Sequence, residues 1–376
     1  MQNFLLPEGF RDSLPELAQK EFTIIHSFLN FISNNGFDLV IPPLLEFENS
    51  LSFLSKKQVN KNSFRVLDPL SQKMMALRSD ITSQVARIAS SAFTKKTVPL
   101  RLCYVGEILK VKSDQLNISR QSTQIGAEII DYNDTVFELE IIILIIDLLK
   151  LMKIKDFSII FSMPSIFDAI VIDFKLSDTE KKSLRDKFSN KNLTEIQNFP
   201  KKLLETSTIL LKNDGNFKVK KTELKKFKFT KLVQIEIKKF LKTLNLIEKK
   251  FRNVDMNIDP IEIDKSGYHN GIMFKFYSKN LVELFSGGSY SIDEKKCIGF
   301  SGLIESMINE SKTIQKKKKK ILVPKNEIDF DRISLIKKNF YFVHLNKIMD
   351  KTALNNTAAK LNCDFYIFNN KLFRIK

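Results

Sequence analysis

The stretch ILKVKSDQLNISRQSTQIGAEI, residues 108–129, carries the pattern that decides the fold. Its two ends are apolar, whereas its middle is polar and contains Lys110 and Arg120. In the second apolar end, Gln124 and Glu128 alternate with isoleucine and alanine residues. Because successive side chains of a strand point to opposite faces, this alternation predicts a strand with one polar and one apolar face.

The surrounding sequence predicts a sheet flanked by helices. Apolar residues recur at helical spacing in residues 15–34, and Asn-Asn-Gly closes that helix. A strand is predicted next, at residues 37–46, where two adjacent prolines suit the edge of a sheet better than its centre. Beyond it the pattern predicts a hairpin at 63–75, a helix beginning near 80 or 82, strands at 100–110 and 123–130, and a buried helix from 134 to about 152.

A change in composition divides the rest of the chain. Residues 156–250 are rich in lysine and poor in glycine, with short amphipathic helices and a capping-box signal at Ser177 and Glu180, which indicates an inserted, mainly helical segment. Two strands and a helix then return to the first pattern, near 271–277, 281–285 and 299–309. The predicted organisation is a core in two parts, residues 1–155 and 251–312, the insertion at 156–250, and a small C-terminal α/β unit at 320–376 that ends in two apolar strands.

Composition excludes several classes of protein. With 376 residues and 43% hydrophobic residues, the chain can bury a core and form two or three domains. Four charged residues interrupt the longest apolar run, at residues 136–152, so we expect a buried helix there and no membrane span. The N-terminus lacks the basic region of a signal peptide, which predicts a cytoplasmic protein. The three cysteines and three histidines are scattered and no glycine-rich phosphate-binding motif is present, so no disulfide, metal site or cofactor is expected.

The formal charge of +18 has two explanations. A strongly basic surface attracts nucleic-acid backbones. The chain also has 51 lysines but only 10 arginines, a bias typical of AT-rich coding, which favours solvated lysines and no specific nucleic-acid partner. On this interpretation the lysine run at 316–320 is an extended linker. Six of the ten arginines fall within the first 120 residues, so contacts that require a planar side chain with several donors are expected there.

Polar side chains are predicted to gather on the sheet in three groups: Asp80 and Thr82, Arg120 with Gln124 and Glu128, and Tyr268 with His269. Carboxylates, an amide and a hydroxyl that converge on a sheet suit the ammonium group of a small zwitterion. The alternative is that Gln124 and Glu128 simply face solvent.

Seven ordered segments resemble a known family. They are PEGFRD (7–12), GFDLVIPPLLE (36–46), LRSDITSQVARIA (77–89), LRLCYVGEIL (100–109), RQSTQIGAE (120–128), YHNGIMF (268–274) and SGGSY (286–290). Their order and spacing resemble the catalytic domain of class II histidyl-tRNA synthetases and, more closely, its paralogues, the regulatory subunits of ATP phosphoribosyltransferase. The resemblance covers about residues 4–150 and 255–310. It implies an α+β fold, with an antiparallel six-stranded sheet flanked by helices, and a dimer formed partly through residues 36–46.

The resemblance also implies roles for individual residues. The positions that contact histidine in the family are matched here by Asp80, Thr82, Gln124, Glu128, Tyr268 and His269. An arginine that would hold the ligand carboxylate is expected near Asp264 or Lys265, and this chain has none there. Lys110 and Arg120 are further candidates, either as ligand contacts or as structural residues.

Two ATP contacts of a synthetase are absent from the matching positions. Lys110 and Lys112 stand where an Arg-x-Glu pair grips ATP, and Ser306 stands where a second arginine is expected. Losing one well-placed transition-state donor costs roughly 2.7–4 kcal/mol, so losing two is expected to slow the reaction on the order of 10⁴-fold. Aminoacylation is therefore not expected.

The resemblance thus implies a regulatory subunit without catalytic activity of its own. Such a subunit acts with the short-form catalytic ATP phosphoribosyltransferase in the first step of L-histidine biosynthesis, as a homodimer within a hetero-octamer, with L-histidine as the effector of feedback inhibition. Two alternatives remain: an active histidyl-tRNA synthetase, and a synthetase-derived RNA-binding protein.

Overall fold

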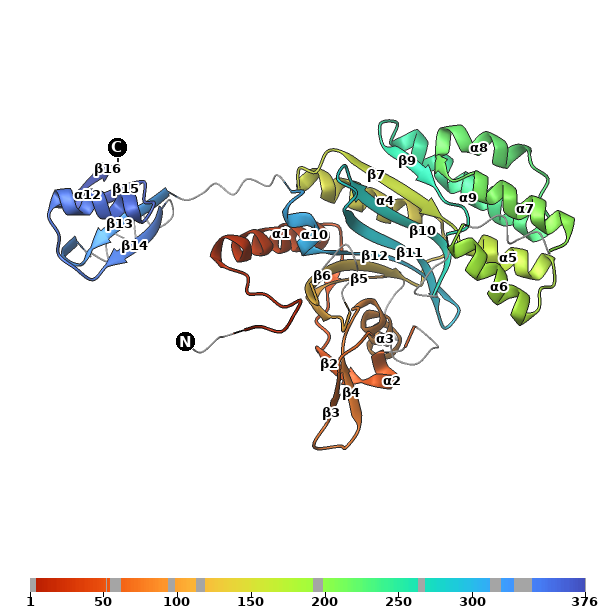
Figure 1. The fold of residues 1–376 in the computed structure, drawn as a ribbon, viewed down its shortest axis with the longest axis horizontal. Coiled ribbons are helices and arrows are strands. Elements are labelled where there is room, and N and C mark those ends of the chain that lie inside the picture. Colours follow the sequence, from red (N-terminus) through yellow and green to blue (C-terminus); the bar gives the residue numbers. More distant parts are fainter. Residues whose placement is uncertain are drawn as a thin grey trace. The chain divides into compact units, whose positions relative to one another are not determined.

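The computed structural model describes residues 5–51, 53–54, 62–93, 99–112, 119–191, 199–262, 268–311, 319–327 and 340–375. The chain forms two compact units, one up to residue 313 and the other from residue 314 onward (Figure 1). Among the described helices, none is long and apolar enough to cross a membrane.

A large sheet forms the centre of the first unit. In the described part of the chain it has nine strands, in the order β1-β5-β6-β12-β11-β10-β7-β9-β8. In that order the strands span Asp38–Leu39, Leu100–Leu109, Gln121–Ile130, Lys295–Leu303, Glu283–Ile292, His269–Ser278, Phe157–Ser162, Asp255–Ile258 and Gly215–Asn216. The six strands from β5 to β7 are antiparallel to their neighbours, as expected. The expectation of six strands in all is wrong, because β1 and β9 extend the sheet in parallel on its two sides and β8 adds a further edge.

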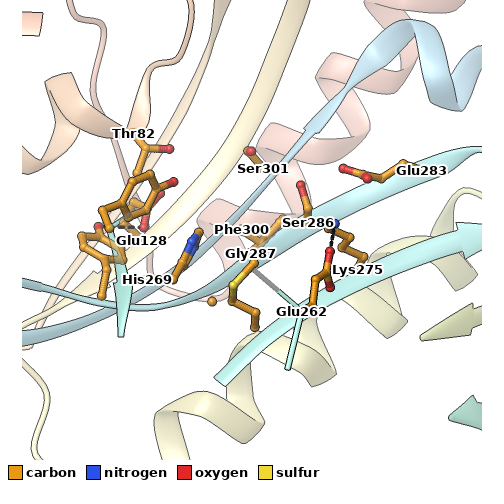
Figure 2. Close-up of a pocket in the computed structure, with 15 residues that line it drawn as sticks. Thr82, Glu128, Glu262, His269, Lys275, Glu283, Ser286, Gly287, Phe300 and Ser301 are labelled. Carbon is orange, nitrogen blue, oxygen red and sulfur yellow. Dashed lines mark hydrogen bonds and ion pairs between the residues drawn. The ribbon is translucent and has the colours of Figure 1, made fainter. Parts of the chain in front are cut away.

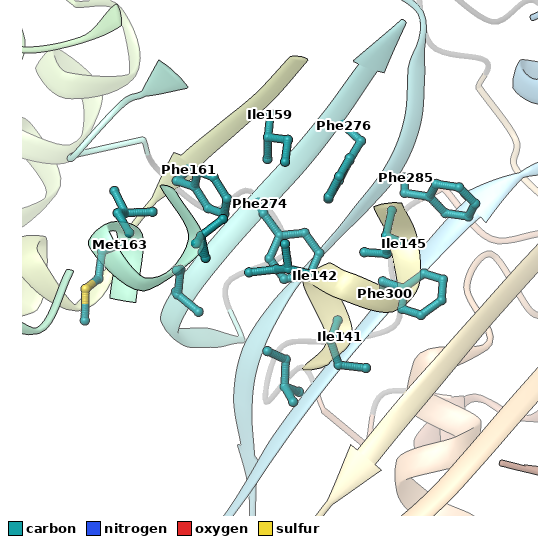
Figure 3. Packing of buried hydrophobic residues seen from close by; sticks show 14 of the residues in the cluster. Ile141, Ile142, Ile145, Ile159, Phe161, Met163, Phe274, Phe276, Phe285 and Phe300 are labelled. Carbon is teal, nitrogen blue, oxygen red and sulfur yellow. The ribbon is translucent and has the colours of Figure 1, made fainter. Parts of the chain in front are cut away.

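Helices cover the two faces of this sheet differently. On one face the long helices α1 (Pro15–Asn34) and α4 (Val136–Leu151) pack against a continuous apolar layer that includes Phe274 (Figure 3). On the other face α3 (Thr82–Ala92) packs beside Tyr290. The alternation along β6 divides its residues between these faces, which confirms the predicted strand. The polar face of β6 is therefore turned toward α3.

The segment with two prolines is divided between two sheets. Residues Asp38–Leu39 form the edge strand β1 of the large sheet, whereas Leu45–Phe47 form β2 in a three-stranded sheet with β4 (Met74–Leu77) and β3 (Arg65–Leu67). The single strand expected over 37–46 is wrong, because proline has no N–H for a strand ladder. The edge position and the β3-β4 hairpin are confirmed. The short helix α2 (Glu48–Leu51) follows β2.

Strands β11 and β12 differ from the predicted elements. Strand β11 continues through the GGSY motif to Ile292, and the helix predicted at 299–309 begins as strand β12 and ends in the short helix α10 (Ile304–Ile308). A Cβ added at Gly287 would lie 2.1 Å from the backbone oxygen of Gly299. Only glycine allows the two strands to approach so closely, and glycine contributes no side chain to a strand pattern.

The inserted segment contributes helices beside β7, β9 and β8 (Figure 1). The described helices are α5 (Ser165–Asp173), α6 (Asp178–Ser189), α7 (Lys201–Lys212), α8 (Phe217–Lys226) and α9 (Lys231–Lys250). The capping box at Ser177 and Glu180 is confirmed at the start of α6. Helix α9 is 20 residues long and so exceeds the short helices predicted. Strand β7 belongs to the central sheet although it lies within residues 156–250.

The C-terminal unit is a small α/β sheet. Its order is β14-β13-β15-β16. Its elements are β13 (Lys319–Pro324), the 3₁₀ turn η2 (Lys325–Glu327), β14 (Phe340–Leu345), α12 (Lys351–Lys360), β15 (Phe365–Phe368) and β16 (Lys371–Arg374). The two final apolar strands are confirmed as an antiparallel pair. Lys319 and Lys320 begin β13 and are not a linker, and residues 316–318 lie outside the described residues.

Arginines in the first part of the chain make contacts that need several donors, as expected. Arg78 is 6% exposed and donates to the carbonyl of Pro42 at 2.8 Å and to that of Glu107 at 2.6 Å. A Cβ added at Gly106 would lie 2.2 Å from a guanidinium nitrogen of Arg78, so the guanidinium group occupies the space that this glycine leaves. It thereby ties the proline bend to β5.

We expect Arg78→Lys to lower the free energy of unfolding by about 2–4 kcal/mol, because one ammonium group cannot reach both carbonyls and leaves a buried acceptor unpaired. The control is Arg65→Lys, since the Arg65 side chain is 49% exposed and pairs with Glu48 near the surface. That change is expected to cost less than about 1 kcal/mol. Urea unfolding followed by circular dichroism measures both, and equal losses would contradict the role of Arg78.

Candidate functional site

A cavity of about 350 Å³ lies on the polar face of the central sheet. Strands β10, β11 and β12 form its floor, and β6 and α3 contribute Glu128 and Thr82. Figure 2 shows Thr82, Glu128 and His269 toward one end and Lys275 toward the other. The cavity is therefore elongated, with different chemistry at its two ends.

Glu128 lies at the deep end and is 1% exposed. The hydroxyl of Tyr290 donates to its carboxyl group at 2.9 Å, and that of Tyr104 at 3.4 Å. A Cβ added at Gly299 would lie 1.7 Å from a carboxyl oxygen of Glu128, so the side chain crosses over β12 through the space that this glycine leaves. Burial raises the pKa of Glu128 to about 8. An empty cavity at neutral pH therefore holds Glu128 mainly as the neutral acid.

Asp80, Thr82 and Gln124 form a hydrogen-bonded network next to Glu128. The amide of Gln124 donates to Asp80 Oδ1 at 2.7 Å and accepts from the backbone N–H of Ile81 at 2.9 Å. Thr82 Oγ1 donates to Asp80 Oδ1 at 3.3 Å and lies 3.1 Å from the Tyr104 hydroxyl. The network thus runs without a break from Asp80 to the tyrosine that contacts the buried carboxyl group.

The structure brings all six predicted histidine contacts together, in two layers. Thr82, Glu128, Tyr268 and His269 line the cavity, whereas Asp80 lies behind Thr82 and Gln124 lies behind Asp80. Gln124 and Glu128 are 5% and 1% exposed, so the alternative in which they simply face solvent is wrong.

Aromatic rings close one wall of the cavity. The rings of Tyr268 and His269 are stacked with centroids 4.3 Å apart, and Tyr268 meets Tyr290 edge-on at 5.8 Å. Such a wall accepts a flat ring in stacked or edge-on contact. Together with the carboxyl group of Glu128, it makes a narrow polar slot with aromatic sides.

The other end of the cavity is charged, and the sequence did not point to it. Lys275 of β10 forms an ion pair with Glu262, and Glu283 also lines this end. The side chains of Lys275 and Glu262 are 27% and 24% exposed. Burial favours the neutral amine, but the ion pair with Glu262 outweighs it and raises the pKa of Lys275. Ser286 and Ser301 lie between the two ends (Figure 2).

Lys110 and Arg120 lie away from the residues that line this cavity. The guanidinium group of Arg120 lies over the rings of Phe10, at 5.2 Å, and Phe64, at 4.9 Å, and donates to the carbonyl of Glu8 at 3.1 Å. These contacts favour the structural alternative for Arg120. The backbone N–H of Lys110 donates to the carbonyl of Arg120 at 2.8 Å, where the long loop begins.

The remaining positions singled out in the sequence lie either outside the described residues or away from this cavity. Residues 113–118 of the long loop lie outside the described residues, as do Asp264 and Lys265. Ser306 lies on α10 and lines a different, more open cavity of about 650 Å³ together with Arg11.

Comparison with known proteins places this geometry in a family. The family model for histidyl-tRNA synthetase matches residues 9–307. The ATP phosphoribosyltransferase regulatory subunit of Paramagnetospirillum magneticum is 31% identical over 287 residues, which are 76% of each chain. That of Rhodospirillum centenum is 28% identical over 76% of this chain and 74% of its own.

Solved structures agree on the fold. An ATP phosphoribosyltransferase regulatory subunit/histidyl-tRNA synthetase from Bacillus halodurans superposes with a TM-score of 0.81 at 21% identity and covers 95% of this chain and 97% of its own. Histidyl-tRNA synthetase from Nostoc gives a TM-score of 0.75 at 16% identity, over 97% of this chain and 91% of its own. This chain therefore belongs to the histidyl-tRNA synthetase family and, within it, to the ATP phosphoribosyltransferase regulatory subunits.

Proposed function

We propose that this chain is a non-catalytic regulatory subunit that is required, with the short-form catalytic ATP phosphoribosyltransferase, for the first step of L-histidine biosynthesis. It binds L-histidine in the elongated cavity and takes part in feedback inhibition as a homodimer within a hetero-octamer. The observation that carries the proposal is the buried carboxyl group of Glu128, held by two tyrosine hydroxyls beside an aromatic slot. Its relatives bear the name of this subunit.

Histidine fits the chemistry of the deep end. The pKa of Glu128 is raised to about 8, and that of a free imidazole is about 6.5. The Glu128 carboxyl group and the ligand imidazole can therefore share a single proton at neutral pH. The aromatic wall formed by Tyr268, His269 and Tyr290 offers edges and faces against which the flat ring can pack. The carboxylate of Asp80, which lies directly behind the lining residue Thr82 and is supported by Gln124, remains for the ligand ammonium group once Thr82 turns aside. We accordingly assign Glu128 to the ring and Asp80 to the ammonium group. This assignment replaces the expectation that both carboxylates contact the ammonium group.

The active synthetase is the weaker candidate. Lys110 and Ser306 occupy the places of two ATP-gripping arginines in the resemblance, and among the described residues that line the cavity none is an arginine. A lysine supplies charge but no bidentate fork. Histidine-dependent exchange of pyrophosphate into ATP at enzymatic rates would overturn the regulatory proposal in favour of this alternative.

The homodimer has a candidate surface. In the single chain, apolar side chains are exposed along the proline segment and the small sheet: Leu39, Ile41, Leu44, Leu45, Phe47, Val66, Leu67, Leu70 and Met74. Exposed apolar side chains that gather on neighbouring strands are typical of a protein interface. This surface coincides with the segment, residues 36–46, that the resemblance assigns to the dimer.

We expect Ile41→Asp to convert the dimer to a monomer, since Ile41 is 79% exposed in the single chain and a charge there would be buried without a partner in a dimer. Light scattering after gel filtration measures the mass. The matched control is Leu281→Asp, because Leu281 is 75% exposed in the turn between β10 and β11. A dimer that survives Ile41→Asp would place the interface elsewhere.

We expect the chain to co-purify with the short-form catalytic subunit from the same genome and to raise its phosphoribosyltransferase activity at least about tenfold, a change of ~1.4 kcal/mol in the barrier. Added L-histidine should then inhibit the complex more strongly than the catalytic subunit alone. Activity is measured with and without this chain at equal catalytic-subunit concentration. An unchanged rate in a stable complex would contradict the regulatory role.

We expect the affinity for L-histidine to be highest between about pH 6.5 and about pH 8, where free ring and free carboxyl group together carry one proton. Above about pH 8 Glu128 ionises in the empty cavity, so binding must take up a proton and weakens by up to about tenfold per pH unit. Below about pH 6.5 the free ring is also protonated, so binding must release a proton and weakens again. Titration calorimetry across this range measures the profile.

Glu128→Gln is the control for this profile. Gln cannot ionise, so its affinity should be lower by about tenfold at neutral pH, because a charge-assisted contact is lost, and should fall less steeply above about pH 8, where only the ligand ammonium group still loses its proton. The fall on the acid side should remain, since the ligand ring still titrates. An alkaline fall of wild-type size in Glu128→Gln would remove Glu128 from the assignment.

A further inference from the structure

The charged end of the cavity lies within reach of the deep end. Register pairs Glu128 with Gly299, Gly299 with Gly288 and Gly288 with Met273, which makes one row across four strands. Lys275 is two residues beyond Met273, on the same face of β10.

The row that contains Lys275 runs beside the first. Lys275 pairs with Ser286, and Ser286 pairs with Ser301. Because the Glu128 side chain already reaches over β12, two strand spacings and a two-residue offset along the strand, together roughly 12 Å, separate its carboxyl group from the backbone of Lys275. A lysine side chain and an amino acid between them can span that gap.

The charges at this end indicate what it recognises. Among the described residues that line the cavity, Lys275 is the one with a permanent positive charge, whereas Glu128, Glu262 and Glu283 are acids. An amino acid whose ring and ammonium group are bound by Glu128 and Asp80 still needs a cation for its carboxylate. Ser286 and Ser301 add hydroxyl donors next to Lys275.

We propose that Lys275 binds the carboxylate of the amino-acid ligand and that Glu262 holds Lys275 in place while the cavity is empty. The inference rests on the proposed function, because it names the third contact of the same ligand. Binding then exchanges one carboxylate for another on the same ammonium group, so the charge of Lys275 stays paired in both states. Glu262 gives up its partner in the exchange, and the cost is limited because its side chain is 24% exposed to solvent.

Glu262 competes with the ligand in this arrangement. Removing its charge should therefore favour the ligand, whereas removing the charge of Lys275 should disfavour it. A pair that served only to hold the fold together would give losses of the same sign for both changes. The two opposite signs are the signature of a binding role.

The experiment measures binding of L-histidine, histamine and L-histidine methyl ester by titration calorimetry. Histamine lacks the carboxylate, and the ester keeps its atoms without the charge. The wild-type protein should bind L-histidine at least about tenfold more tightly than either, because a charge-assisted contact contributes roughly 1.5–3 kcal/mol. Lys275→Met should weaken L-histidine at least about tenfold and leave histamine within about threefold.

Two further variants sharpen the test. Glu262→Gln should bind L-histidine a few-fold more tightly, and Lys150→Met should behave as wild type, since Lys150 is an exposed lysine that is also paired with an acid, Asp147. If Lys275→Met fails to fold, Glu262→Gln and the ester comparison decide.

The outcomes separate the two levels of the proposal. Undiminished preference for L-histidine over histamine in Lys275→Met, or weaker binding in Glu262→Gln, overturns the role of Lys275 and leaves the proposed function standing. A wild-type protein that binds neither L-histidine nor histamine overturns the histidine site itself, and the role of Lys275 with it.

Discussion

The structure depends on a carboxyl group that is buried in the middle of a sheet. An unpaired acid at 1% exposure would cost several kcal/mol, and the hydroxyls of Tyr104 and Tyr290 offset that cost from the two neighbouring regions of the sheet. Both contacts require β5, β6, β12 and β11 to keep their register, because a slip by one residue would turn Glu128 to the apolar face. Gly299 is needed as well, since any side chain there would occupy the place of the carboxyl group.

Much of this fold could be predicted from residue patterns, and the exceptions have a common cause. Helix α1 and strands β5 and β6 follow from periodicity, because each carries a regular apolar face. The helix expected at 299–309 begins only at Ile304, because the glycines at the end of β12 leave gaps in the strand pattern. Those glycines are required by close contacts between neighbouring strands, such as that of Gly287 with Gly299. The local sequence pattern of one strand does not reveal such contacts.

The candidate site could likewise be predicted only in part from the sequence. The residues around Glu128 could be named from the polar face of β6 together with the ordered segments of the family. Lys275 could not be named in this way, because the chain has 51 lysines and nothing in the local sequence distinguishes this one. Its ion pair with Glu262, a residue that follows β9, is visible only in the folded chain. Arginine was more informative than lysine here. Arg78 and Arg120 each use several donors, so a scarce residue type marked places where geometry matters.

Two ion pairs connect the insertion to the cavity. Lys191, which follows α6, binds Asp259 at 3.0 Å and Asp214 at 2.9 Å, and Glu262, three residues beyond Asp259, binds Lys275. Burial raises the pKa of Asp259, and the ion pair with Lys191 opposes this effect. In the proposed exchange, a ligand that changes the partner of Lys275 acts on residues 259–262, the segment that Lys191 contacts. Such a ligand can shift that segment only as far as its affinities for the two arrangements differ.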